Sequence, residues 1–371
     1  MVRQRIVEKY FGTVHIRRSS RAGLTGLALL AFCLNPSEPH ACAFDMVKPE
    51  LTQIDRIIEA ERLVLARSGQ TNPFTFEATN VLVGPDEGPL IEYLVDSTTR
   101  RRLARNPSDE VLFSYSVDQG WKRIAYVDES FRIVLDTALE NRSEWQTGMT
   151  QSRVDFIKTL QERDNRADWT LIIGELDKVP YRQLREMDLN ISDDELRAEL
   201  WSKRGYPYQA ILALLVGLSG TAESRAEING FIERAIDRDS VDNLGAFTAA
   251  YLELEGAQGA KNLEHGFLLN PFQSLEKLEQ IVMAMSVHHG LEDLELRNSI
   301  HKAIGRLVTN RPEAGAIIAR QFSLRSDWSQ ASQLEPLVRK RQVASLTDML
   351  TISVYLGRAR EAASVKAATD G

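Results

Sequence analysis

The chain has 371 residues, with 45 Lys and Arg against 52 Asp and Glu, a net charge of −7 and only two cysteines. The 43% hydrophobic and 26% charged residues are typical of a globular protein with enough material for a large core. This composition excludes collagen-like, coiled-coil and wholly disordered chains, and the length indicates about two domains.

Residues 1–43 are expected to be a signal peptide. A basic segment precedes an apolar run over residues 22–34, which is shorter than the ~20 residues that span a bilayer. The sequence Ala41-Cys42-Ala43 has the A-x-A form of a cleavage site. A buried N-terminal helix is the alternative, but such a helix would be amphipathic. We therefore expect cleavage near Ala43 and a periplasmic or secreted protein, with Arg17-Arg18 leaving twin-arginine export as the alternative to the general secretory route.

Lipid anchoring is disfavoured because Phe32 is too large for the position before a lipidated Cys33. Removal of residues 1–43 takes away six basic and two acidic residues, which changes the net charge from −7 to −11 and leaves no cysteine. A chain this acidic is not expected to bind nucleic acid, because phosphate contacts need a basic surface. Disulfides and thiol catalysis are excluded from the mature chain in the same way.

Residues 44–145 are predicted to form a small β domain, either a barrel or a sandwich. After a helix over residues 51–61, five β-rich segments are separated by Gly, Pro and Asp turns. We expect strands at residues 63–66, 74–83, 90–95, 111–116 and 121–127.

Residues 146–371 are predicted to form an all-α domain, an α-solenoid of HEAT-like helix pairs. Short helical segments follow one another with tight breaks, for example at Gly256 and Gly290. The nearly all-apolar segment 208–218 is too short to span a membrane, so we expect a buried central helix and no transmembrane segment in the mature chain. Arg166-Ala167-Asp168-Trp169 recurs as Arg325-Ser326-Asp327-Trp328, and each aspartate is expected to cap a helix. The overall fold class is therefore α+β.

With these features, the chain resembles uncharacterised exported bacterial proteins that have a small N-terminal β domain and C-terminal HEAT-like helical repeats. The residues that carry the resemblance are segments 63–66 and 76–85 in the first part, and 244–254 and 267–271 in the second. The β part is also similar to netrin-like and OB-type barrels, whose N-terminal cysteine framework is absent here. The resemblance implies an architecture and no reaction.

Histidines give one candidate metal site. His288 and His289 come directly before Gly290, and the metal hypothesis combines either of them with Glu264, His265, Glu292 or His301. No histidine pair has the i, i+4 spacing of helical metal ligands, so capping of the helix C-terminus explains these residues better. We expect no cofactor.

Two further groups of residues are candidate binding sites. Arg100, Arg101 and Arg102 form a dense basic cluster in an otherwise acidic chain, which could meet an anionic partner; a solvated loop or helix is the alternative. Trp145 or Trp201 with Tyr206 and Tyr208 could form a sugar-binding platform, although tryptophans at helix ends usually pack in the core.

No catalytic motif is present: the chain has no G-x-S-x-G, P-loop or G-x-G-x-x-G sequence after a strand. The sequence therefore favours an exported, non-enzymatic interaction or scaffold protein with a protein partner. The alternative is a periplasmic enzyme, or an accessory protein that binds a small ligand, with a site assembled between the helices.

Overall fold

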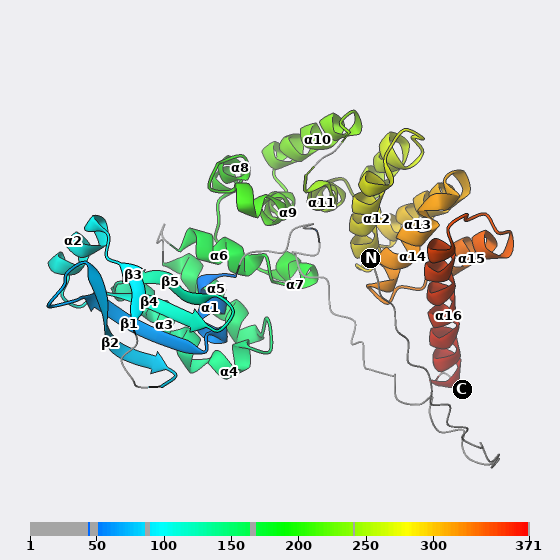
Figure 1. Cartoon of the computed structure of the whole chain (residues 1–371). Helices are drawn as coiled ribbons and strands as arrows, with labels where there is room; N and C mark the ends of the chain where they lie inside the picture. Colours follow the sequence, from blue (N-terminus) through cyan, green and yellow to red (C-terminus); the bar gives the residue numbers. More distant parts are fainter. Residues whose placement is uncertain (1–43, 45–50, 86–89, 164–167, 240–241, 370–371) are drawn as a thin grey trace, which may run out of the picture. The chain divides into compact units, whose positions relative to one another are not determined.

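The structure is a computed structural model, and it describes residues 44, 51–85, 90–163, 168–239 and 242–369 (Figure 1). The predicted signal peptide and its cleavage site lie outside the described residues. The described part is α+β, as predicted: a five-stranded sheet near the N-terminal end is followed by a mostly helical region.

The sheet is antiparallel throughout, with the strand order β3-β2-β1-β4-β5. It is a curled half-barrel, where the sequence led us to expect a small barrel or a sandwich. All five expected strands are present within one or two residues of their predicted bounds. The strands are β1 (Arg62–Ser68), β2 (Thr75–Val83), β3 (Ile91–Leu94), β4 (Glu110–Ser116) and β5 (Gly120–Val127).

Strand β1 lies in the middle of the sheet and is buried on both faces. Its side chains alternate, so that Leu63 and Leu65 join the main core while Val64 and Ala66 join a second, smaller core. Burial on both faces explains why this strand reads as a continuous apolar run instead of an alternating one. Helices α1 (Gln53–Glu59) and α3 (Glu129–Glu140) contribute to the main core, and α2 (Ser97–Arg105) contributes to the smaller one.

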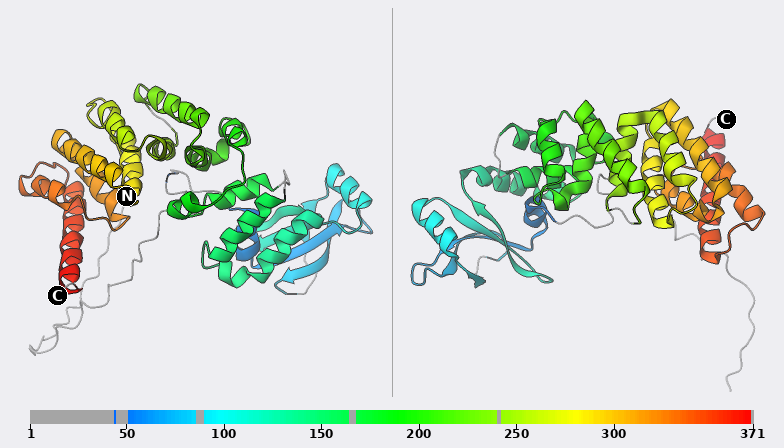
Figure 2. Two further views of the ribbon diagram at one scale, coloured as in Figure 1. Left: turned by 180° about the vertical axis from the view of Figure 1, so that it is seen from behind. Right: turned by 90° about the horizontal axis from the view of Figure 1, so that it is seen from above.

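Strand β5 is an edge strand, since β4 is its one strand partner among the described residues. A register shift between Leu112 and Phe113 of β4 leaves Ile124 of β5 as an extra residue in the pairing. Such a bulge bends the strand and re-aims its side chains. The free edge of β5 lies beside α1 and α6 in the fold (Figures 1 and 2).

Helices make up the rest of the described chain, and helices that are close in sequence pack on one another (Figure 2). The assignment of these pairs to HEAT repeats remains a prediction. The remaining helices are α4 (Arg142–Trp145), α5 (Gln151–Glu162), α6 (Trp169–Leu176), α7 (Tyr181–Glu186), α8 (Asp193–Leu200), α9 (Gln209–Ser219), α10 (Ala222–Ile236), α11 (Leu244–Leu263), α12 (Leu275–His289), α13 (Leu294–Asn310), α14 (Gly315–Ser323), α15 (Ala331–Arg339) and α16 (Leu346–Thr369). Short 3₁₀ or π turns are Tyr206–Tyr208, Glu264–Leu268 and Pro312–Ala314.

Helix α9 is the buried central helix that its apolar sequence predicts. Its residues from Gln209 to Gly217 are all buried, and Gly217 faces Ala250 of α11 so closely that a Cβ added there would lie 2.7 Å from the Cα of Ala250. The helix ends at Gly220, which has the left-handed φ of 69° that terminates many helices. The expected break at Gly256 is also present, with φ 53° inside α11.

The predicted aspartate caps are wrong at both Asp-Trp sequences. Asp168 stands before α6 but its side chain makes no capping hydrogen bond. Asp327 lies four residues before α15, so Trp328 precedes the helix, and the Asp327 carboxylate instead binds the ring of His289. At Asp327, the carboxylate therefore binds a side chain of another helix, α12, instead of capping α15.

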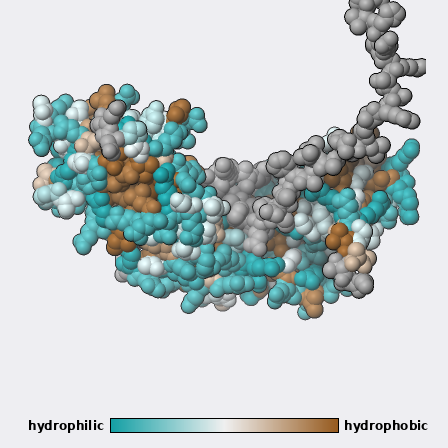
Figure 3. Space-filling view, turned by 90° about the horizontal axis from the view of Figure 1, so that it is seen from below, coloured by the Kyte–Doolittle hydropathy of each residue, from teal (hydrophilic) through white to brown (hydrophobic). Residues whose placement is uncertain are grey.

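In the part of the chain that the structure describes, no helix is long and apolar enough to cross a membrane. The face seen from below is mostly hydrophilic, with hydrophobic residues gathered in one area on its left side (Figure 3).

Candidate functional site

A groove runs along the free edge of β5, and we call it the β5 groove. It consists of two adjacent pockets of about 310 and 270 Å³ that share Gln53 and Leu171 as lining residues. Residues 122–126 of β5 line one wall, and residues of α1 and α6 line the other. The groove therefore brings together three elements that are more than 40 residues apart in the sequence.

The first pocket is lined by three cations and no carboxylate. Arg123 is already neutralised, because its guanidinium donates to Asp96 at 3.1 Å and to Thr99 at 2.9 Å. Arg56 and Lys122 make no side-chain hydrogen bond or ion pair with any other residue that the structure describes. Two cations without a partner among the described residues give this pocket a positive potential, which favours an anionic group.

The arginine cluster of α2 separates on folding. Arg100 lies over the ring of Phe74 at 4.7 Å, and Arg101 donates to the Ser97 carbonyl of its own helix. Arg102 is the member of the cluster that lines the groove, where its guanidinium lies 3.6 Å from the centre of the Tyr126 ring. The cluster therefore contributes one cation to the β5 groove.

The floor of the first pocket includes Tyr208 and Thr52. Gly174 of α6 lets both approach, since a Cβ added to Gly174 would lie 3.0 Å from Thr52 Cγ2 and 3.6 Å from Tyr208 Cε1. Tyr208 also contacts the Trp169 ring edge-on, with 6.4 Å between the ring centres.

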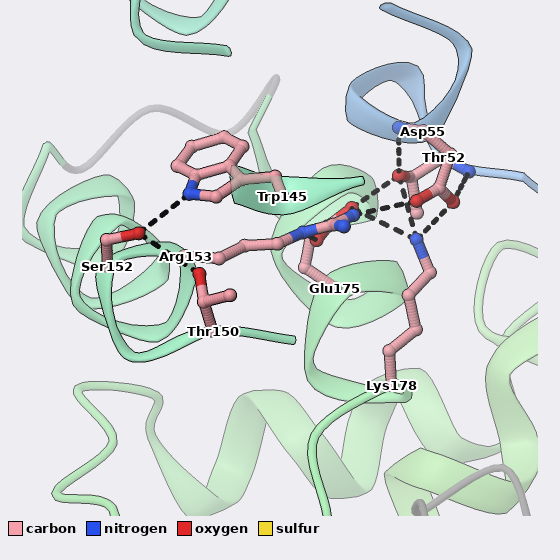
Figure 4. A network of polar contacts seen from close by, with 8 residues as sticks. All are labelled: Thr52, Asp55, Trp145, Thr150, Ser152, Arg153, Glu175 and Lys178. Atoms are coloured by element: carbon pink, nitrogen blue, oxygen red, sulfur yellow. Dashed lines mark hydrogen bonds and ion pairs between the residues drawn. The ribbon is translucent and has the colours of Figure 1, made fainter. Parts of the chain in front are cut away.

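Behind this floor lies a buried ionic network (Figure 4). Arg153 of α5 donates through Nε to Glu175 at 2.7 Å and through Nη2 to Asp55 of α1, also at 2.7 Å. Lys178 reaches the same two carboxylates, and Thr52 donates to Glu175. The four charges sum to zero. The Arg153 and Glu175 side chains are only 4% and 0% exposed, so the network is withdrawn from water.

Each charge in the network depends on its partners. Burial opposes ionisation of Asp55, but Lys178 and Arg153 outweigh it and lower the pKa of this carboxyl. Burial likewise opposes the charge on Arg153, but Glu175 and Asp55 raise its pKa. Both shifts favour the ionised forms of Asp55 and Arg153, and the network ties α1 to α5 and α6. Because Thr52 also caps α1 with a capping box, the network fixes the helix that forms one wall of the groove.

The predicted aromatic platform does not form, because its members lie in different surroundings. Trp145 is 1% exposed and donates to Ser152 Oγ at 2.8 Å, so its ring is not open to a ligand. Trp201 is half-exposed and packs against Phe231, while Tyr206 is exposed on its 3₁₀ turn. Tyr208, in the β5 groove, is the one that lines a pocket described here.

The predicted metal ligands also diverge. His288 is buried against Tyr181, and burial lowers the pKa of its ring to about 4. The His289 ring binds Asp327 at 2.6 Å, whereas Glu292 is exposed beyond the end of α12. Among the residues that the structure describes, no three His, Cys, Asp or Glu side chains come together as metal ligands.

Sequence reasoning missed Arg56, Lys122 and the whole ionic network. Three charges of the network come from three different helices, at Asp55, Arg153 and Glu175. No sequence motif indicates that these three residues are in contact. The free edge of β5 gave no signal either, because strand order is not visible in a single sequence. Searches of protein families, curated proteins and solved structures found no match to this chain.

Proposed function

We propose that this chain is a non-enzymatic partner-binding protein that takes up an extended acidic segment of another protein in the β5 groove. The observation that carries the proposal is the free edge of β5 beside the uncompensated cations Arg56 and Lys122.

The free edge determines the shape of the bound segment. Residues 122–126 line the groove, and the edge of β5 away from β4 has no strand partner among the described residues. An extended peptide can add to such an edge through main-chain hydrogen bonds. Because main-chain bonds are independent of sequence, the side chains of the groove provide the specificity.

The cations determine the charge of the bound segment. Arg56 and Lys122 stand in the first pocket. In the second, Arg102 lies 3.7 Å from Asp128 in a half-exposed ion pair, and the other carboxylate of that pocket, Asp168, lies 3.6 Å from Arg163. Acidic side chains that alternate along a strand would meet these cations from the side of the strand that faces the groove. A segment with basic side chains would be repelled by Arg56 and Lys122 in the first pocket.

Export and a scaffold role belong to the same proposal. The apolar run and the A-x-A sequence before Phe44 support export, and the resemblance to exported proteins with helical repeats supports a second contact surface on the helices. The HEAT-like nature of those helices is part of the proposal.

Two labelled octapeptides test the proposal by fluorescence anisotropy: one alternates Glu and Val, and the other alternates Lys and Val. We expect the acidic peptide to bind, its affinity to fall with added salt, and the basic peptide not to bind. N-methylation of alternate backbone nitrogens of the acidic peptide should abolish binding, because strand addition needs those N–H groups.

Charge reversal tests the groove itself. Arg56→Glu with Lys122→Glu should lower the affinity for the acidic peptide by at least about tenfold. Arg101→Glu with Arg102→Glu should lower it less, because of these two arginines only Arg102 lines the groove. Lys366→Glu, on the exposed end of α16, is the control. Equal affinities of the reversed and control variants would refute the groove. A periplasmic crosslinking pull-down that recovers no stoichiometric partner would refute the scaffold role.

A further inference from the structure

Another pocket lies between α5, α6 and α8, separate from the two pockets of the β5 groove. Its volume is about 660 Å³, within the range of small-molecule sites. Trp169 and Ile172 lie on the side of α6 that faces it, whereas Thr170 and Leu171 line the β5 groove. The two sites therefore share one helix, and the contact between Trp169 and Tyr208 joins their walls.

Two buried N–H groups in this pocket have no hydrogen-bond partner among the residues that the structure describes. They belong to Trp169 Nε1 and Gln161 Nε2, and the two residues are only 6% and 9% exposed. The orientation of the Gln161 amide is fixed, because its Oε1 accepts from the Asn190 N–H at 2.9 Å. Unpaired buried donors are uncommon because they destabilise the fold, so two of them in one pocket need an explanation.

The pocket also contains an acceptor without a partner. Glu195 of α8 is half-buried, and its carboxylate makes no hydrogen bond with another residue that the structure describes, although its charge acts on Arg204 in the same pocket. The other charges are compensated: Glu199 pairs with Arg204, and Asp194 pairs with Arg197. Leu160 and Ile172 supply apolar surface beside these polar groups.

This combination specifies the chemistry of a ligand. The two N–H groups need acceptors and the carboxylate needs a donor, and a hydroxyl group can serve as either. A pyranose ring carries several hydroxyls around its edge and apolar C–H groups on its faces, which suit the apolar walls. Arg204 lies over the Trp169 ring at 4.2 Å, so its side chain is the part that must move when a ligand enters.

We infer that the pocket between α5, α6 and α8 binds a neutral saccharide of one or two rings. Trp169 and Gln161 donate to its hydroxyl oxygens, and Glu195 accepts from a hydroxyl. The sequence offered Trp145 or Trp201 as a weak candidate for a sugar-binding platform, and the pocket points instead to Trp169, which was not among those candidates.

The test is saturation-transfer difference NMR on the full chain with maltose, cellobiose and N,N′-diacetylchitobiose, followed by titration of whichever sugar gives a signal. Trp169→Phe keeps an aromatic ring but removes the N–H, and Glu195→Gln removes the negative charge at a partly exposed position while keeping the size of the side chain. Each change should weaken binding by about 3–10-fold, the size of one lost hydrogen bond. Trp201→Phe, which removes a half-exposed indole elsewhere, should leave affinity unchanged.

The absence of a signal from all three sugars at about 10 mM would overturn the inference. It would also be overturned if Glu195→Gln and Trp201→Phe bound with the same affinity as the unmodified chain, even where Trp169→Phe fails to fold. The acidic octapeptide serves as an independent measurement, so failure of sugar binding is distinguishable from failure of the β5 groove.

Discussion

Replacement of Arg153 by Met tests whether the buried network holds the fold together. The guanidinium donates three hydrogen bonds to carboxylates, at 2.7 Å to Glu175 Oε2, 3.0 Å to Glu175 Oε1 and 2.7 Å to Asp55 Oδ1. Methionine fills similar space but supplies none of them, so Lys178 alone would face two negative charges.

The expected loss follows from this burial. Removing one partner of a buried ion pair typically costs 3–5 kcal/mol, because the remaining charge is left without compensation in a medium of low dielectric constant. Both carboxylates are less than 10% exposed, so water cannot replace the lost partner. We therefore expect Arg153→Met to lower the free energy of unfolding by about 3–5 kcal/mol at pH 7.

The double variant Arg153→Met with Glu175→Gln isolates the charge effect. It leaves Asp55 and Lys178 as a balanced pair, so its loss should be smaller than the sum of the two single losses by about 1–3 kcal/mol. The dependence of stability on acidic pH gives a second test. The pKa of Asp55 is lowered in the folded state, so the stability it contributes is present above about pH 4 and is lost as the pH falls below that value. This loss should be smaller in Arg153→Met.

Urea unfolding of the full chain, followed by far-UV circular dichroism at pH 7 and pH 3.5, measures these differences. If the free energy of unfolding of Arg153→Met lay within about 1 kcal/mol of that of the unmodified protein, the reasoning would be refuted. Strict additivity of the two losses in the double variant would refute it as well. Either result would mean that water or relaxation compensates the charges that the structure shows as buried.

Three further changes have definite expected outcomes. Gly217→Ala should destabilise the fold by about 1–3 kcal/mol, because its Cβ would lie 2.7 Å from Ala250 on α11. A Cβ at Gly357 on α16 would have nothing within 4 Å, so Gly357→Ala should be neutral or stabilise the fold by up to about 1 kcal/mol in thermal unfolding. Burial opposes ionisation of Asp193, but serine, threonine and arginine donors lower its pKa to about 2. Asp193→Asn should therefore lower the free energy of unfolding by about 2 kcal/mol at pH 7, and by less as the pH falls from about 4 towards 2. A constant difference in stability across that pH range would contradict this. Phe44→Ala should cost about 3–5 kcal/mol, because its ring is fully buried against Tyr181, and unchanged thermal stability would show that this contact is dispensable.

The sequence predicted elements well because their signals are local. All five strands of the sheet were identified from β-rich segments between turn residues, and the burial of α9 followed from its apolar composition. Gly256 and Gly220 mark helix breaks because their left-handed φ is costly for other residues. These are properties of a few neighbouring residues, which a single sequence displays directly.

The sites were predicted poorly because they depend on contacts between distant segments. Arg102 and Tyr208 were singled out as candidates, yet the groove that they share with Arg56 exists only because β5 is an edge strand next to α1 and α6. Trp169 was not singled out as a binding residue in the sequence, where it appeared only beside an aspartate expected to cap a helix. Its unpaired N–H appears only when α5 and α8 are placed around it.

The placement of α1 connects these observations. This helix has only seven residues, too few to be stable alone, and the capping box of Thr52 and Asp55 satisfies its first N–H groups. The same two side chains bind Glu175, Arg153 and Lys178, so the charges that cap the helix also hold it against α5 and α6. Arg56 follows them by one position and lines the β5 groove. Arg56 is therefore presented by a helix whose position a neutral and largely buried network determines. A surface charge alone would be screened and mobile, whereas one fixed beside a free strand edge can select its partner.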